Sequence, residues 1–152
     1  MEGLSGPTVR GVGLDLVDLA RFGEVVARRP GVLGRIFTDD ELRAVAGVGG
    51  GGSFDRVSRQ AALFAAKEAV MKSIGVGLDR VPLHDIVVCE DGTSGPGIEL
   101  VGAAADRAGS LGVRDVAVTI TRTGGVVSAM AISSGPDGAG SAARGRVRRP
   151  VS

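Results

Sequence analysis

The stretch VSRQAALFAAKEAVMKSI, residues 57–74, carries the longest helical repeat of apolar residues in the chain. Leu63, Ala66, Val70 and Ile74 follow one another at intervals of three and four, which places them on one face of an α-helix. The many alanines between them leave room for a neighbouring element to approach closely. The stretch therefore predicts a long central helix on which the other elements pack.

Alternating apolar residues predict strands on both sides of this helix. In residues 9–17, Val12, Leu14 and Leu16 alternate with glycine or aspartate, which is typical of a strand with one face against a core. Asp15 therefore points the other way. Further strands are predicted at residues 86–89, 98–101 and 116–120, and the last continues through a Thr-Gly-Gly turn into residues 126–132 as a hairpin.

Shorter helices complete the expected domain. Residues 18–28 have apolar residues at helical spacing after Asp18, which is a suitable N-cap. Thr38 and Glu41 form a capping box at the start of a second helix, and an alanine-rich helix is predicted at residues 103–111. This order of elements predicts an α+β domain, with a mostly antiparallel sheet packed on the long central helix.

Length and composition favour one folded domain, which we place at residues 1–134. The chain has 152 residues, of which 43% are hydrophobic and 23% charged, and its formal net charge is +1, the balance of a globular protein. Residues 135–152 are rich in Gly, Ala, Ser and Arg, so we interpret them as a disordered basic tail. A docking arm for an acidic partner is the alternative for that tail.

Composition also disfavours several classes of function. No apolar run reaches the ~20 residues that span a bilayer, and the N-terminus lacks the order of a secretory signal, so we expect no membrane partner and a cytoplasmic protein. The chain has no Trp or Tyr for base stacking, so we expect no nucleic-acid partner. The single cysteine, Cys89, lies in an apolar run and is interpreted as a buried, inert thiol.

A glycine pattern near the N-terminus falls short of a dinucleotide-binding fingerprint. Gly11 and Gly13 would be the first two glycines of that motif, but Leu16 stands where the third is needed. We instead expect that the missing side chains let a ligand approach the strand beside the Asp15 carboxylate. A solvated Asp15 without a functional role is the alternative.

The central helix carries a charged pair, because Glu68 and Lys72 are four residues apart and lie on one face. Taken alone, this pair is interpreted as an exposed ion pair worth ~0.3–0.5 kcal/mol. Glu68 and Asp15 together are also suited to holding one Mg²⁺ ion, which prefers oxygen ligands and usually keeps waters and substrate phosphates. Lys67, Lys72 and Arg21 would then balance phosphate charge.

Three segments resemble one protein family, in the right order and at the right separation. Residues 11–22, GVGLDLVDLARF, and residues 64–75, FAAKEAVMKSIG, resemble the two signatures of the holo-acyl-carrier-protein synthase type of 4′-phosphopantetheinyl transferase. RIFTDDEL, residues 35–42, resembles the family's segment between them. The resemblance covers residues 9–133 and implies the 4′-phosphopantetheinyl transferase fold.

This resemblance implies a magnesium-dependent enzyme that transfers the 4′-phosphopantetheine group of coenzyme A to a serine of an acyl carrier protein. The transfer releases adenosine 3′,5′-bisphosphate and would serve fatty-acid, polyketide or peptide biosynthesis. Family members are usually trimers with active sites between subunits. We therefore expect a homotrimer whose partner is an acyl carrier protein.

The resemblance also assigns roles to individual residues. Asp15 and Glu68 match the metal-binding carboxylates, and with Lys72 they form the expected catalytic set. Lys67 and Lys72 match positions near the pyrophosphate. Three arginines match or extend a basic patch that meets phosphate or the acidic carrier helix: Arg21, Arg28 and Arg29.

Two family motifs are altered in this chain. The family's Val-Ser-Ile-Ser-His or Val-Ser-Ile-Thr-His reads Val-Thr-Ile-Thr-Arg here, ending at Arg122 and followed by Thr123. Arginine can hold a phosphate, but it cannot exchange a proton near neutral pH. The usual Gly-Lys-Pro turn reads Ser-Gly-Pro, ending at Gly95 and Pro96, which removes a cation near the expected nucleotide pocket. The implied coenzyme-binding set still includes these four residues.

The altered motifs leave more than one function open. The first is an active transferase, and the second is a repurposed member of the same fold that has lost transfer activity and uses the interfacial pocket for another biosynthetic reaction or for binding. An unrelated interaction domain is a third. The only histidine, His84, lies at the start of a predicted strand and is not expected to replace the missing one.

Overall fold

The computed structural model describes residues 6–47, 52–90 and 95–137. Its elements in chain order are β1 (Thr8–Asp18), α1 (Leu19–Arg28), the 3₁₀ helix η1 (Pro30–Val32), α2 (Leu33–Ile36), α3 (Asp39–Gly47), α4 (Ser53–Ser73), the 3₁₀ helix η2 (Leu83–Asp85), β2 (Ile86–Glu90), β3 (Pro96–Leu100), α5 (Gly102–Ser110), β4 (Asp115–Thr123) and β5 (Val126–Gly135). Most of the predicted basic tail, residues 138–152, lies outside the described residues.

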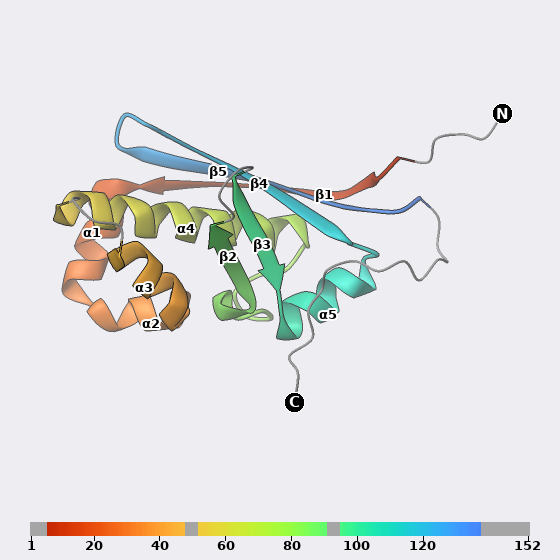
Figure 1. Ribbon diagram of the computed structural model, residues 1–152, viewed down its shortest axis with the longest axis horizontal. Helices are drawn as coiled ribbons and strands as arrows, with labels where there is room; N and C mark the ends of the chain where they lie inside the picture. Colours follow the sequence, from red (N-terminus) through yellow and green to blue (C-terminus); the bar gives the residue numbers. More distant parts are fainter. Residues whose placement is uncertain (1–5, 48–51, 91–94, 138–152) are drawn as a thin grey trace.

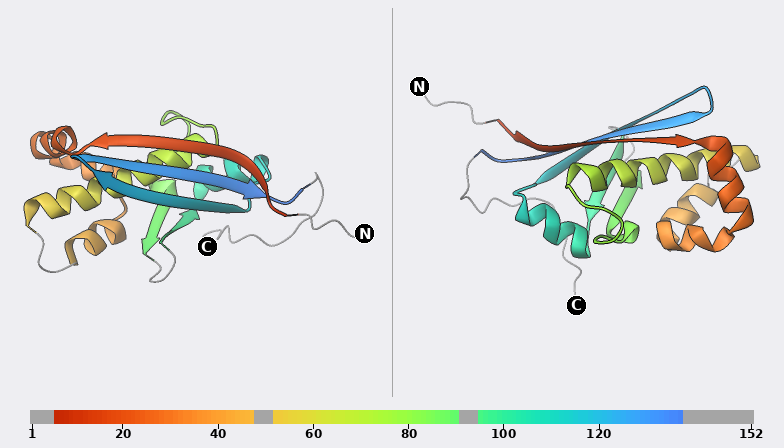
Figure 2. Two further views of the ribbon diagram at one scale, coloured as in Figure 1. Left: turned by 90° about the horizontal axis from the view of Figure 1, so that it is seen from above. Right: turned by 180° about the vertical axis from the view of Figure 1, so that it is seen from behind.

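An antiparallel three-stranded sheet, in the order β1-β5-β4, lies along the long helix α4 (Figure 1). Helices α1, α2 and α3 gather at one end of α4, and the antiparallel pair β2-β3 lies with α5 toward the other end. Seen from above, the three sheet strands run side by side over α4 (Figure 2). The predicted α+β class, with an antiparallel sheet on a long central helix, is confirmed.

Helix α4 is central because its apolar face is built mainly of alanine. Ala61, Ala65, Ala66 and Ala69 are all fully buried. Small side chains let the sheet and the shorter elements approach the helix axis closely, and the core around them also contains Phe22 and Phe37. The helix begins four residues before the predicted residue 57.

Among the described residues, no helix is both long and apolar enough to cross a membrane.

The strand β1 lies directly on the backbone of α4 at two glycines. A Cβ atom built on Gly11 would lie 1.9 Å from the carbonyl oxygen of Ser73, and one built on Gly13 would lie 1.8 Å from that of Ala69. Both distances are far below van der Waals contact, so only glycine fits. This corrects the expectation that these glycines open the strand to a ligand, because helix backbone fills the space.

The two faces of β1 are reversed relative to the prediction. The apolar residues Val12, Leu14 and Leu16 are 58%, 55% and 66% exposed, whereas Val17 on the opposite face is 7% exposed. Met130, which pairs with Leu14 across the β1-β5 ladder, is also exposed. We call Val12, Leu14, Leu16 and Met130 the outer sheet face. The expectation that the apolar face of β1 covers the core is therefore wrong.

Candidate functional site

Asp15 faces α4 because it shares the glycine-bearing face of β1. The Asp15 Oδ1 atom lies 2.7 Å from Lys72 Nζ, and the same ammonium donates a 2.8 Å hydrogen bond to the carbonyl oxygen of Leu14. Asp15 is largely buried, with 14% of its side chain exposed, and Lys72 is half-exposed at 48%. The structure thus brings together two of the three predicted catalytic residues in a direct ion pair.

Glu68 lies one helical turn before Lys72 and completes this group. Its Oε1 atom is buried and has no hydrogen-bond partner within the described part of the chain. Burial raises the pKa of Glu68, the nearby Asp15 charge raises it further, and Lys72 opposes both effects. A buried carboxylate oxygen without a partner is costly, and a bound cation would remove that cost.

The residues of this group fit a magnesium ion. No cluster of three or more His, Cys, Asp or Glu side chains suited to a metal occurs within residues 6–47, 52–90 and 95–137. Magnesium does not require such a cage, because it is commonly held by one or two carboxylates together with waters and substrate phosphates. Asp15 and Glu68 supply two carboxylates from neighbouring elements, and the unpartnered Glu68 oxygen is available as a ligand.

Lys67 takes no part in this group, although it is the neighbour of Glu68 in sequence. Its side chain is fully buried, and its Nζ atom donates to Glu41 Oε2 at 2.7 Å, to the Ile36 carbonyl at 2.9 Å and to the Leu83 carbonyl at 3.1 Å. Three bonds use all three N–H donors of an ammonium. This corrects the expectation that Lys67 contacts the pyrophosphate.

Glu41, which sequence analysis assigned only to a helix cap, is the partner that holds Lys67. The predicted capping box is confirmed, since Glu41 Oε2 accepts from the Thr38 backbone at 2.8 Å and Thr38 Oγ1 accepts from the Glu41 backbone at 3.2 Å. Glu41 Oε1 also accepts from the Val88 backbone at 2.9 Å. One carboxylate therefore joins α3, α4 and β2, an arrangement for which the sequence carries no local signal.

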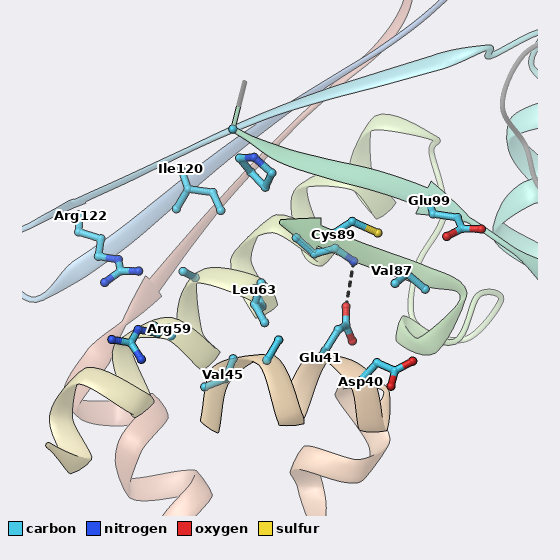
Figure 3. A pocket seen from close by; sticks show the side chains of 15 residues that line it. Asp40, Glu41, Val45, Arg59, Leu63, Val87, Cys89, Glu99, Ile120 and Arg122 are labelled. Carbon is cyan, nitrogen blue, oxygen red and sulfur yellow. Dashed lines mark hydrogen bonds between the residues drawn. The ribbon is translucent and has the colours of Figure 1, made fainter. Parts of the chain in front are cut away.

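A second candidate region is a cavity of about 910 Å³ bounded by α3, α4, β2, β3 and β4. Arg122 from β4 and Arg59 from α4 reach into the same end of it (Figure 3). Arg122 Nη1 donates a 3.0 Å hydrogen bond to Ser58 Oγ, and Arg59 forms an ion pair with Asp55. Two guanidinium groups at one end of a cavity favour an anionic ligand there.

The walls of this cavity are mostly apolar. Gly95 and Pro96, two of the predicted coenzyme-binding residues, lie on its rim, and Cys89 also lines it. Cys89 is half-buried, which corrects the expectation of a buried thiol. Thr123 ends β4 beside the Gly124-Gly125 turn, is exposed, and is not part of the lining.

The two candidate regions lie on opposite sides of the domain. Asp15 is on β1 and Arg122 on β4, which are the two edges of the three-stranded sheet. Arg59 and Glu68 are nine residues apart on α4, and nine residues amount to about two and a half helical turns, so the side chains point in opposite directions. Within one chain, the carboxylates of Asp15 and Glu68 therefore lie apart from the guanidinium groups of Arg59 and Arg122.

The remaining predicted residues lie at the surface. Asp18 caps α1 as predicted, accepting from the Arg21 backbone at 2.8 Å, and the Arg21 side chain is exposed. Arg28 is exposed, 3.6 Å from Glu24, and Arg29 is exposed beside it. His84 Nε2 lies 2.9 Å from the Phe37 carbonyl oxygen, a contact within the fold, and His84 is not among the residues that line the cavity.

The chain is similar to proteins of one family. A family model described as the 4′-phosphopantetheinyl transferase superfamily matches residues 11–121. The chain is 40% identical over 131 residues to a holo-[acyl-carrier-protein] synthase of Anaeromyxobacter dehalogenans, covering 84% of this chain and 97% of that one. It is 41% identical over 128 residues to the enzyme of the same name from Frankia casuarinae, covering 82% and 97%.

A solved structure agrees with this chain in fold. The ACPS–CoA complex of Chronobacterium ammoniagenes superposes with a TM-score of 0.67 at 25% sequence identity, covering 81% of this chain and 95% of that one. That protein is described as a complex with coenzyme A, and its similarity extends over nearly the whole described part of the present chain.

Proposed function

Because this chain belongs to the 4′-phosphopantetheinyl transferase superfamily, we propose that it is a holo-acyl-carrier-protein synthase. It transfers the 4′-phosphopantetheine group of coenzyme A to a serine of an acyl carrier protein. The observation that carries this proposal is the meeting of Asp15 and Glu68 beside Lys72, from two segments that resemble the family's signatures.

In the proposed reaction the serine oxygen forms a bond to the phosphorus that carries pantetheine. The bond from that phosphorus to the bridging diphosphate oxygen breaks, and adenosine 3′,5′-bisphosphate leaves with that oxygen. Magnesium, when bound, stabilises negative charge on the diphosphate. Asp15 and Glu68 are the residues proposed to hold it, and the unpartnered Glu68 Oε1 supports this assignment. Localisation in the cytosol, where coenzyme A is available, follows from this activity as part of the proposal.

Arg122 is proposed to bind a phosphate of coenzyme A and to take no part in proton transfer. A guanidinium stays protonated at neutral pH, so it cannot accept the serine proton, and that task falls to the carboxylates Asp15 and Glu68. Arg59, which lines the same end of the cavity, is proposed to share the phosphate. The apolar walls between Gly95 and Leu63 suit the adenine ring.

The active site is proposed to form between subunits of a homotrimer. Two observations support this assembly. The carboxylates and the arginines occupy opposite edges of the sheet in one chain, so a complete site needs a second copy. The outer sheet face is also apolar and exposed, and such a surface is typical of a subunit interface.

The carrier protein is proposed to dock on the exposed basic side chains of α1 and of its C-cap residue Arg29. Arg21, Arg28 and Arg29 are all exposed at this end of the molecule. Arginine pairs well with carboxylates, so an acidic helix of the carrier protein is the expected partner surface.

The test is intact mass spectrometry of an apo acyl carrier protein incubated with this protein, coenzyme A and magnesium. We expect a gain of one phosphopantetheine group, and no gain with the Glu68→Ala variant. Arg80→Ala, which removes one member of an exposed ion pair with Asp79 to which no function is assigned, is the matched control and is expected to retain the gain. The absence of a gain across several apo carriers would reject the transferase and favour a repurposed member of the fold.

A further inference from the structure

The ammonium of Lys72 already occupies the position of a cation beside Asp15. It lies 2.7 Å from Asp15 Oδ1 and 2.8 Å from the Leu14 carbonyl oxygen, so two oxygens of β1 hold it. Both are hard oxygen donors of the kind that coordinate magnesium. The neighbouring Glu68 oxygen has no hydrogen-bond partner in the described part of the chain.

A divalent cation that binds Asp15 and Glu68 has to enter this same small space. The positive charges of the cation and the ammonium repel each other, and the repulsion is strong where the surroundings are partly dry. Asp15 is 14% exposed, so water screens the pair poorly on that side. The ammonium and the metal therefore compete for one carboxylate.

We propose that Lys72 acts as a resident counter-ion for Asp15 in the metal-free protein, and that magnesium binds by displacing it. This inference rests on the metal site of the proposed function and concerns how that site is controlled. The displaced ammonium stays on the helix face of Glu68, one turn away, where it meets any anionic group that the metal holds.

The two lysines of the motif show why Lys72 is the one that moves. The Lys72 side chain is 48% exposed, and its long stem reaches water without disturbing the fold. The Lys67 side chain is fully buried, with three oxygen partners. Moving the Lys67 ammonium from its three oxygen partners would leave a buried charge unpaired. Moving the Lys72 ammonium from Asp15 leaves it in contact with water.

A consequence is coupling between the metal and the diphosphate of coenzyme A. An anion bound beside the metal offers the displaced ammonium a new partner, which lowers the cost of displacement. Binding of either ligand then favours binding of the other, by the same factor in both directions. Without Lys72 this part of the coupling disappears, while direct contact between metal and phosphate remains.

The experiment is calorimetric titration of the full-length protein with magnesium chloride alone, without coenzyme A or carrier. Lys72→Met is expected to bind magnesium about tenfold more tightly than the unmodified protein, the effect of removing one charge-assisted competitor at a half-exposed site. Lys72→Arg, which keeps the charge, is expected to bind no more tightly than the unmodified protein. Asp15→Asn is expected to lose binding.

Equal or weaker magnesium binding by Lys72→Met would overturn the proposal, because Lys72 would then assist the metal or ignore it. Lys72→Gln is the second neutral variant, and it is used if thermal melting shows that Lys72→Met is unfolded. The titration contains no coenzyme A, so its result does not depend on whether the protein catalyses the transfer reaction. If neither the unmodified protein nor the neutral variants bind magnesium, this inference fails together with the metal site, even where transfer activity is found.

Discussion

Replacing Glu41 by Gln tests the buried ion pair that fixes Lys67. Glutamine is close to isosteric with glutamate, but its single oxygen can accept from only one of the Val88 and Thr38 backbone N–H groups, which bind different carboxylate oxygens. The change removes the negative charge 2.7 Å from an ammonium that is fully buried. Burial already lowers the pKa of Lys67, and the bond to Glu41 opposes that effect.

Glu41→Gln is expected to lower the free energy of unfolding by a large amount for a change at one side chain. Removing one partner of a buried ion pair typically costs about 3–5 kcal/mol, a large share of the ~5–15 kcal/mol that holds an ordinary domain folded. Adding Lys67→Met to Glu41→Gln removes the stranded ammonium, so the double variant is expected to regain stability relative to Glu41→Gln alone. The two changes should therefore not be additive.

Urea denaturation of the four proteins of this cycle measures the effect. A loss below about 1 kcal/mol for Glu41→Gln, or a further loss on adding Lys67→Met, would refute the assignment of Lys67 to the core. The transfer assay adds a second criterion. A folded double variant should retain activity, whereas a pyrophosphate-binding Lys67 would make it inactive.

Four further predictions concern the sheet, the carboxylates and the cavity. Gly13→Ala places a Cβ 1.8 Å from the Ala69 oxygen and should cost at least about 3 kcal/mol in urea denaturation; a loss below ~1 kcal/mol would contradict the contact. Folding raises the pKa of Glu68 above its ordinary 4.5, so stability from its protonated form is present below that pH and is lost as pH rises through the folded value. Glu68→Gln should therefore melt at a higher temperature than the unmodified metal-free protein at pH 8, with the difference closing toward pH 4.5; a pH-independent difference would argue against this origin. Leu14→Glu on the outer sheet face should shift the protein from trimer to monomer in light scattering after size exclusion, and an unchanged mass would move the interface elsewhere. Arg122→Gln should raise KM for coenzyme A about tenfold or more with little change in KM for the carrier; an unaltered KM would remove Arg122 from the phosphate site.

The sequence predicted the elements better than their orientation. The repeat in residues 57–74 identified α4, and the alternation in residues 9–17 identified β1, because both periods follow from backbone geometry. An alternation of period two defines two faces but does not say which one meets a helix. On β1 the answer is the glycine face, because alanine-rich α4 packs closest against an element without side chains.

The candidate site was predicted in part for a related reason. Asp15, Glu68 and Lys72 come together because residues 68 and 72 share a helix face that β1 covers. Residue 67 is rotated by about 100° from residue 68, which is enough to send Lys67 into the core beside Glu41. Lys67 and Glu41 are far apart in sequence, so no local sequence pattern predicts their ion pair. Arg59 was missed because its importance depends on Arg122, which reaches the same cavity from another element.

The contact of β1 with α4 has a consequence for protein design. At Gly11 and Gly13 the two backbones touch without side chains between them, so the separation of Asp15 from Glu68 follows from main-chain dimensions. The separation of the two carboxylates therefore does not depend on side-chain volumes elsewhere in the core. Repacking residues such as Val127 or Ile74 is therefore expected to change melting temperature while leaving the spacing of the carboxylates intact, and stabilised versions of this protein can be sought in the core without redesigning the metal site.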